Sequence, residues 1–170
     1  MNSTQWKQER TLIRNRLKKL TRSDLPSGAR EDAWTGEQVL LHVLLTNKNI
    51  LELLERLFAK ANPEDEKESG KAWPVREDLE SVVTERAFSV DAFKGTEPVI
   101  EVTEPELAEL ELRENVLVDL VEKADRFKCE SIVFPHPLAG RMNFYEWFVF
   151  ALWHERAHTQ RLEQDLGLRA

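Results

Sequence analysis

Two histidines stand four positions apart in the segment NFYEWFVFALWHERAHTQRLEQDL at 143–166. On a helix, side chains four residues apart lie about 5–6 Å apart at Cβ, so His154 and His158 can reach the same ion. A histidine on an apolar helix face is more often a hydrogen-bonded core residue than a ligand. Both interpretations are open for the pair, and the spacing indicates a candidate divalent-metal site.

The segment that carries the pair has the signals of a helix. Asn143 is a favourable N-cap, Glu146 three residues later completes a capping box, and Gly167 is a typical C-terminal stop. At about 100° per residue, both histidines fall on an otherwise apolar stripe. The other members of that stripe are Phe144, Trp147, Ala151 and Leu162. Both imidazoles are therefore expected to point into a core.

Three more long helices are predicted at 4–20, 35–61 and 103–128 from apolar residues at helical spacing. The second and third again begin with capping boxes, which pair Thr35 with Gln38 and Thr103 with Glu106. His42 stands in the most apolar part of the second helix. A charged imidazole would be costly there, so His42 is expected to be neutral and to need a hydrogen-bond partner or a metal ion.

Two connections are less regular. The connection at 62–102 exceeds the usual helix–helix loop and is interpreted as a crossover with some character of a lid. Within it, REDLESVVTERAF predicts a short amphipathic helix, and SVDAFKGTEPVIEV is expected to be extended. The stretch SIVFPHPLAGRM at 131–142 is expected to be a packed apolar loop.

Together these elements predict an all-α fold, a single domain over 1–170. The expected architecture is a four-helix bundle with up-down-down-up topology and a long crossover between helices two and three. Helices two and four are then antiparallel, and His42 falls within about one turn of the depth of His154 and His158. A site shared by the three histidines is feasible.

Three pieces of the chain resemble the DinB-like (YfiT-like) superfamily of four-helix-bundle metalloenzymes: WTGEQVLLH, HPLAGRMNFYEW and HERAH. The resemblance implies that His42, His154 and His158 bind one divalent ion and leave positions for water or substrate. Zinc or nickel is expected first, with iron or manganese as alternatives. Such families include metal-dependent hydrolases and S-transferases that act on low-molecular-weight thiols. Their members often have glutamine where this chain has Arg161; here Gln160 precedes it.

The same residues also spell HExxH, the zincin protease signature in which the glutamate is the general base. Zincins take their third ligand from downstream, yet Glu163 and Asp165 lie on the same predicted helix end and cannot return to the ion. A protease is therefore the less favoured alternative. A non-catalytic bundle, metal-stabilised or serving interactions, is the other.

The substrate is expected to be a small molecule. Hydrolysis and thiol transfer would both use an ion held by the same three histidines. Glu155 is the candidate catalytic residue, with a supporting or a solvated role as alternatives. His136, between two prolines, is expected to be a structural loop residue rather than a fourth ligand. Arg161 could reach an anionic substrate, although an exposed helix arginine is the simpler interpretation.

Composition limits the partners of this chain of 170 residues. A net charge of −7 argues against a nucleic-acid partner, and no apolar run is long enough for a membrane span. Cys129 is the only cysteine, and the first residues lack the apolar core of a signal peptide, so a cytoplasmic location is expected. Helix four is apolar on more than one face, at Phe148, Phe150, Leu152 and Trp153. Burial beneath the crossover or a homodimer contact would explain this.

Overall fold

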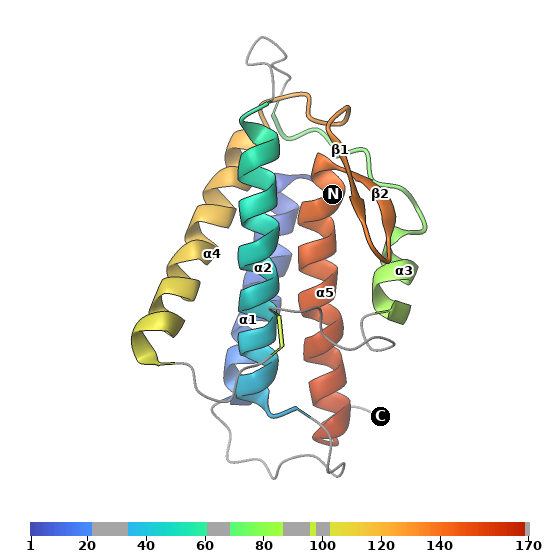
Figure 1. The fold of residues 1–170 in the computed structure, drawn as a ribbon. Helices are drawn as coiled ribbons and strands as arrows, with labels where there is room; N and C mark the ends of the chain where they lie inside the picture. Colours follow the sequence, from blue (N-terminus) through green and yellow to red (C-terminus); the bar gives the residue numbers. More distant parts are fainter. Residues whose placement is uncertain (22–33, 61–68, 87–95, 98–102, 169–170) are drawn as a thin grey trace.

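The computed structural model describes residues 1–21, 34–60, 69–86, 96–97 and 103–168. These ranges contain five helices and one small sheet (Figure 1). The elements are α1 (Ser3–Thr21), α2 (Gly36–Phe58), α3 (Leu79–Arg86), α4 (Glu104–Ala124), β1 (Val133–His136), β2 (Gly140–Asn143) and α5 (Phe144–Asp165). The all-α class is confirmed in its broad form, since the described ranges are mostly helical and contain one small two-stranded sheet besides the helices.

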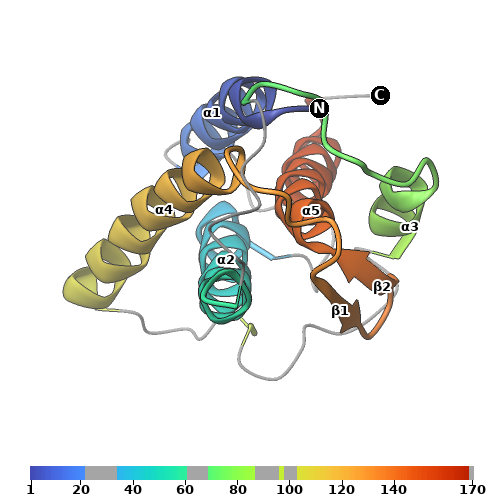
Figure 2. The same cartoon turned by 90° about the horizontal axis from the view of Figure 1, so that it is seen from above.

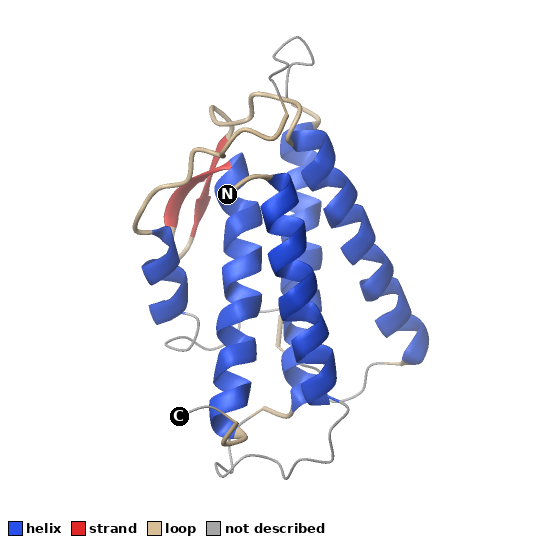
Figure 3. Cartoon of the chain, turned by 180° about the vertical axis from the view of Figure 1, so that it is seen from behind, coloured by secondary structure: helices blue, strands red, loops and turns tan. Residues whose placement is uncertain are grey.

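The four long helices lie side by side (Figure 1). Helix α2 packs against α4 and α5, and α1 packs against α5 and α2. Helices α1 and α5 run in one direction, and α2 and α4 run in the other. Seen from above, α3 and the hairpin lie outside this group on the side of α5 (Figure 2), and the view from behind shows the same arrangement (Figure 3). None of the helices in the described ranges has the length and apolar content of a membrane span.

Helices α2, α4 and α5 each begin one residue after their predicted N-cap. At α5, the Asn143 side chain accepts hydrogen bonds from the N–H groups of Tyr145 and Glu146, and Glu146 accepts from the Asn143 N–H. Capping boxes are also present at Thr35 and Thr103. Local side-chain chemistry therefore sets where these helices start.

Helix α5 is buried on nearly every side. Phe148 and Leu152 are fully covered, and the indole N–H of Trp6 in α1 donates to the carbonyl of Phe148 at 2.7 Å. Helix α3 covers another part of α5. The apolar residues that indicated either burial or a homodimer contact are therefore covered within the chain, apart from the half-buried Trp153. The homodimer stays a prediction.

The stretch at 131–142 was expected to be a loop, and that expectation is wrong. Strands β1 and β2 pair antiparallel, with Phe134 opposite Met142 and His136 opposite Gly140. The turn is closed by the His136 side chain, whose Nδ1 accepts from the N–H groups of Leu138 and Ala139. Gly140 has φ +70°, a conformation that favours glycine. These local bonds are the physical reason for the hairpin.

The predicted short helix in the crossover is α3, which buries Leu79 and Val83. Just before it, Arg76 joins three parts of the fold: its N–H donates to Glu146, and its guanidinium donates to the carbonyls of Ala139 and Arg141. The hairpin is thereby fixed to the start of α5. The extended stretch predicted at 89–102 lies outside the described residues except at Thr96 and Glu97.

Candidate metal centre

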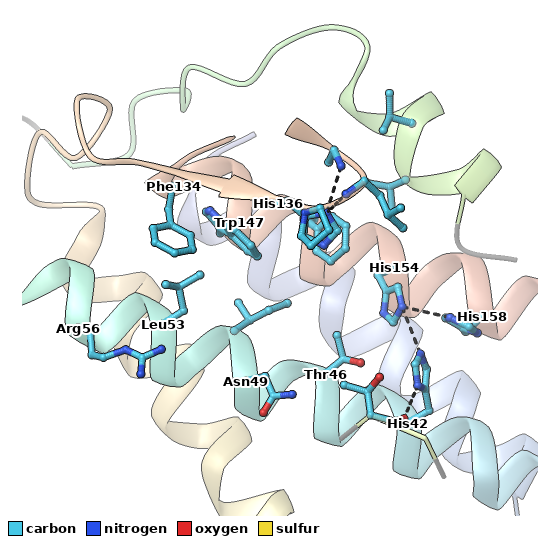
Figure 4. Close-up of a pocket in the computed structure, with 18 of the residues that line it drawn as sticks. His42, Thr46, Asn49, Leu53, Arg56, Phe134, His136, Trp147, His154 and His158 are labelled. Carbon is cyan, nitrogen blue, oxygen red and sulfur yellow. Dashed lines mark hydrogen bonds between the residues drawn. The ribbon is translucent and has the colours of Figure 1, made fainter. Parts of the chain in front are cut away.

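Helices α2 and α5 bring three histidines together at one wall of a cavity (Figure 4). The Nε2 atom of His154 lies 3.4 Å from Nε2 of His42 and 3.1 Å from Nε2 of His158. One ligand nitrogen from each of the three histidines lies within 4.8 Å of the other two. The antiparallel packing of the two helices therefore joins the single histidine of α2 to the pair on α5.

These spacings fit the ligand shell of one metal ion. Two imidazole nitrogens bound tetrahedrally at about 2.0–2.1 Å are separated by about 3.3–3.4 Å, and ligands at right angles by about 2.9 Å. The separation of 3.1 Å between His154 and His158 lies between these values, and that of 3.4 Å between His154 and His42 matches the tetrahedral one. Three neutral nitrogen donors that leave further positions open are the donor set of a catalytic zinc-type site. The residues present fit a divalent ion.

The tautomer of His42 supports the same arrangement. Its Nδ1 lies 2.7 Å from the carbonyl oxygen of Thr96, which can only accept, so Nδ1 carries the proton. Nε2 then presents its lone pair toward His154. A carbonyl that holds the remote nitrogen is the usual way in which proteins orient a metal-ligating imidazole. His154 differs, because its buried Nδ1 has no hydrogen-bond partner among the described residues.

Burial keeps the three imidazoles neutral. All three side chains are less than a tenth exposed. Removal from water lowers the pKa of all three, and neighbouring histidines add to this effect at His154 and His158. Together these causes bring the pKa of His154 well below 6.5 and that of His158 to about 3. Neutral imidazole is the form that binds a metal ion, so protons do not compete for these nitrogens near pH 7.

Aromatic rings enclose the cluster. The indole of Trp34 stacks on His158 with the rings 8° from parallel and also contacts His42, with ring centroids 4.9 Å apart. Phe150 stacks on His154 from within α5. These rings restrict both the rotation of the imidazoles and the access of water. The ligand nitrogens are therefore held in a low-dielectric setting, where electrostatic effects are stronger than in water.

His136 lies in the hairpin and lines the same cavity without joining the three-histidine cluster. Because its Nδ1 accepts two backbone N–H groups, Nε2 carries the proton. Burial lowers its pKa to about 4. The structural role expected for His136 matches these contacts.

Glu155 does not face the cluster. Its carboxylate is fully buried and accepts hydrogen bonds from Arg14 of α1, with Arg10 also nearby. It is not among the residues that line the cavity. The catalytic role expected for Glu155 stays a prediction that these contacts do not support.

Glu155 belongs to a buried cluster of charged side chains, formed with Arg10, Arg14 and Glu114, that was not predicted from the sequence. Arg10 and Arg14 of α1 also pair with Glu114 of α4, and the Asn47 amide of α2 lies 3.4 Å from the same carboxylate. Desolvation lowers the pKa of Arg10 to about 10, although nearby Glu155 opposes this shift. Arg10 and Glu114 each stand on an otherwise apolar helix stripe, and this placement is the sequence signal from which a buried charge pair could have been predicted.

The cavity has a volume of about 380 Å³ and lies between α2, α5, α3 and the hairpin. Most of its wall is apolar, as is usual for small-molecule sites of this size. On α2, all but one of its lining residues recur every three or four positions, at His42, Thr46, Asn49, Leu53 and Arg56; Ile50, next to Asn49, also lines it. That spacing places them on one helix face, a signal present in the sequence but not used to predict site residues. Arg161 instead pairs with Asp165, and neither residue lines the cavity.

Comparisons with protein-family models, curated proteins and solved structures find no match to this chain.

Proposed function

We propose that this protein is a four-helix bundle of the DinB-like type with up-down-down-up topology. Two features support the proposal. The four long helices pack on one another with α2 and α4 parallel to each other and opposed to α1 and α5. The three motifs that carry the resemblance supply His42, the hairpin that leads into α5, and the pair His154 and His158.

The proposed site binds one divalent metal ion through His42, His154 and His158, and the protein is a metal-dependent enzyme acting on a small molecule. The convergence of three buried, neutral Nε2 atoms at the wall of a cavity is the observation that carries this proposal. When bound, the ion supplies Lewis acidity that lowers the pKa of water or of a thiol. The reaction is accordingly hydrolysis, or thiol S-transfer that acts on a low-molecular-weight thiol.

The chain's own residues then have defined tasks. The carbonyl of Thr96 holds His42 in the Nδ1–H form, and Phe150 and Trp34 fix the planes of the other two imidazoles. The apolar wall excludes water and positions the substrate beside the ligands. Because Glu155 is held by Arg14, the geometry offers no general base from HExxH, and the protease hypothesis gains no support.

Metal analysis of protein purified without a nickel column tests the proposal. We expect about one equivalent of zinc or nickel in the wild type and a large loss in His42→Ala and His154→Ala. His136→Asn is the matched control: asparagine keeps an acceptor near the position of Nδ1, so the turn is retained and the metal stays bound. A wild type that binds no metal after supplementation would refute the site.

Activity assays separate the enzyme from the alternative of a metal-stabilised bundle. Metal-loaded protein is tested with thiols in the presence of electrophiles and with ester substrates, and the same assays are repeated with His154→Ala. Turnover that requires both metal and His154 supports an enzyme. Metal binding without any turnover would favour a structural ion.

A further inference from the structure

We propose that the cavity binds a carboxylate with an extended apolar body, whose charged group pairs with Arg56 and whose other end lies beside the three histidines. The part of this inference that concerns the end of the ligand beside the histidines rests on the proposed metal site. The recognition of the outer end stands on separate residues, so the two can fail independently.

The shape of the cavity is the first argument. His42 and Arg56 both line it and are separated by fourteen residues of α2, so their backbones are about 21 Å apart along the helix. Figure 4 shows the histidine cluster at one end of this row and Arg56 at the other, with Thr46, Asn49 and Leu53 between them. A ligand that contacts both ends must be elongated.

The chemistry of the wall is the second argument. Between the two ends, the cavity is lined mainly by apolar side chains. They include Ile50, Leu53, Val82, Val83, Trp147 and Phe150. These residues come from α2, α3 and α5, so the ligand body is surrounded from several sides. Such a wall favours an alkyl or aryl body over a sugar or a peptide backbone, whose polar groups would lose their hydrogen bonds to water.

The charge at the outer end is the third argument. Arg56 is exposed and has no ion pair within the described ranges, and it is the one cationic side chain among the lining residues. Asn49, Phe134 and Pro137 are also exposed, whereas the histidines are buried, so the cavity opens on the side of Arg56. A carboxylate fits a guanidinium at such a mouth, because it forms two parallel hydrogen bonds there and remains partly hydrated.

Two buried polar atoms give the ligand further contacts. Neither Nε1 of Trp147 nor Oγ1 of Thr46 has a hydrogen-bond partner in the described parts of the chain, and both residues line the cavity. Trp147 is 5% exposed, so its unsatisfied N–H is costly unless a bound molecule accepts from it. The ligand is thus expected to carry an acceptor along its body, such as an ether, ester or thioether.

Binding of decanoate, decanol and decylamine, measured by calorimetry on metal-free protein, tests the head group. We expect decanoate to bind at least about tenfold more tightly than the other two, and Arg56→Gln to remove that preference. Lys48→Gln, which removes a cation that does not line the cavity, is the matched control and keeps the preference. Equal binding of the three ligands, or an unchanged preference in Arg56→Gln, would overturn the inference.

Two further variants test the orientation. Leu53→Trp narrows the passage between the ends and should weaken decanoate binding, while Leu112→Trp, at an exposed residue that does not line the cavity, should leave it within about twofold. If decanoate binds only to metal-loaded protein and ignores Arg56→Gln, its carboxylate sits at the histidines, and the inference fails while the metal site survives. If the wild type binds no metal but keeps its preference for decanoate, the metal site fails and the inference about Arg56 survives.

Discussion

The Nη2 atom of Arg14 lies 2.8 Å from Oε2 of Glu155, and Nε of the same arginine donates to the other carboxylate oxygen. This two-point contact joins α1 to α5 immediately beside His154 in the sequence, yet on a different side of the helix. Glu155 is fully buried, and Arg14 is 13% exposed. The neighbour of the metal-ligand candidate therefore ties two helices together.

The first prediction concerns this contact. Glu155→Gln should lower the free energy of unfolding by about 3 kcal/mol, because it leaves the buried charge of Arg14 without its main partner. The metal content should not change, since the carboxylate does not face the histidines. Urea unfolding and metal analysis of the same preparation measure both quantities.

Glu122→Gln is the control for that substitution. Glu122 pairs with Lys7 at the surface and is about half exposed, so its loss should cost less than about 1 kcal/mol. If Glu155→Gln instead kept its stability but abolished turnover, Glu155 would be a catalytic base, as the HExxH pattern predicts.

Much of the fold could be predicted because its information is local. Capping residues such as Thr35 and Asn143 determine helix starts within a few residues of chain, and apolar spacing determines the buried face. The hairpin at 133–143 was missed because its turn depends on the His136 side chain accepting two backbone bonds, which no apolar pattern records. A strand that contains Pro135 also gives a weak strand signal.

The candidate site likewise has residues that could be predicted from local sequence and residues that could not. His154 and His158 are neighbours on one helix, so sequence spacing alone pairs them, and His42 was joined to them by helix direction and depth. The orientation of Glu155 could not be predicted, because it depends on Arg10 and Arg14, which are distant in sequence. Arg56 was missed for another reason: an arginine near a helix end usually lies in solvent, and only the position of the hairpin reveals the cavity that it borders.

The second prediction concerns acid stability. Folding lowers the pKa of His136 from its ordinary value near 6.5 to about 4, so between these pH values the unfolded chain holds a proton that the folded protein does not. The free energy of unfolding of metal-free protein should therefore fall as the pH drops from 6.5 toward 4. His136→Asn should show a shallower fall, measured by urea unfolding across this range in EDTA. An unchanged slope would mean that His136 titrates alike in both states.

The third prediction concerns metal and stability. An ion that binds only the folded state at a free concentration of 100 times its Kd raises the free energy of unfolding by about 2.7 kcal/mol. Wild-type protein and His136→Asn should therefore show a higher Tm with zinc than with EDTA. His158→Gln should show almost no difference, because one of the three ligand nitrogens is lost. An equal zinc effect in His158→Gln would place the ion elsewhere.

The last prediction separates two roles of Asn143. Its Oδ1 caps α5 by accepting from Tyr145 and Glu146, while its Nδ2 donates to the carbonyl of Pro74 at 2.7 Å and so holds the segment before α3. Asn143→Ala loses both functions and should cost about 1–2 kcal/mol. Asn143→Asp keeps the cap but cannot donate, so it should recover most of that stability.

Hydrogen exchange at residues 71–78 should nevertheless be faster in both variants, whereas Thr35→Ala, which weakens the cap of α2, should leave this segment unchanged. Normal protection of the segment in Asn143→Asp would show that the Pro74 contact does not hold it.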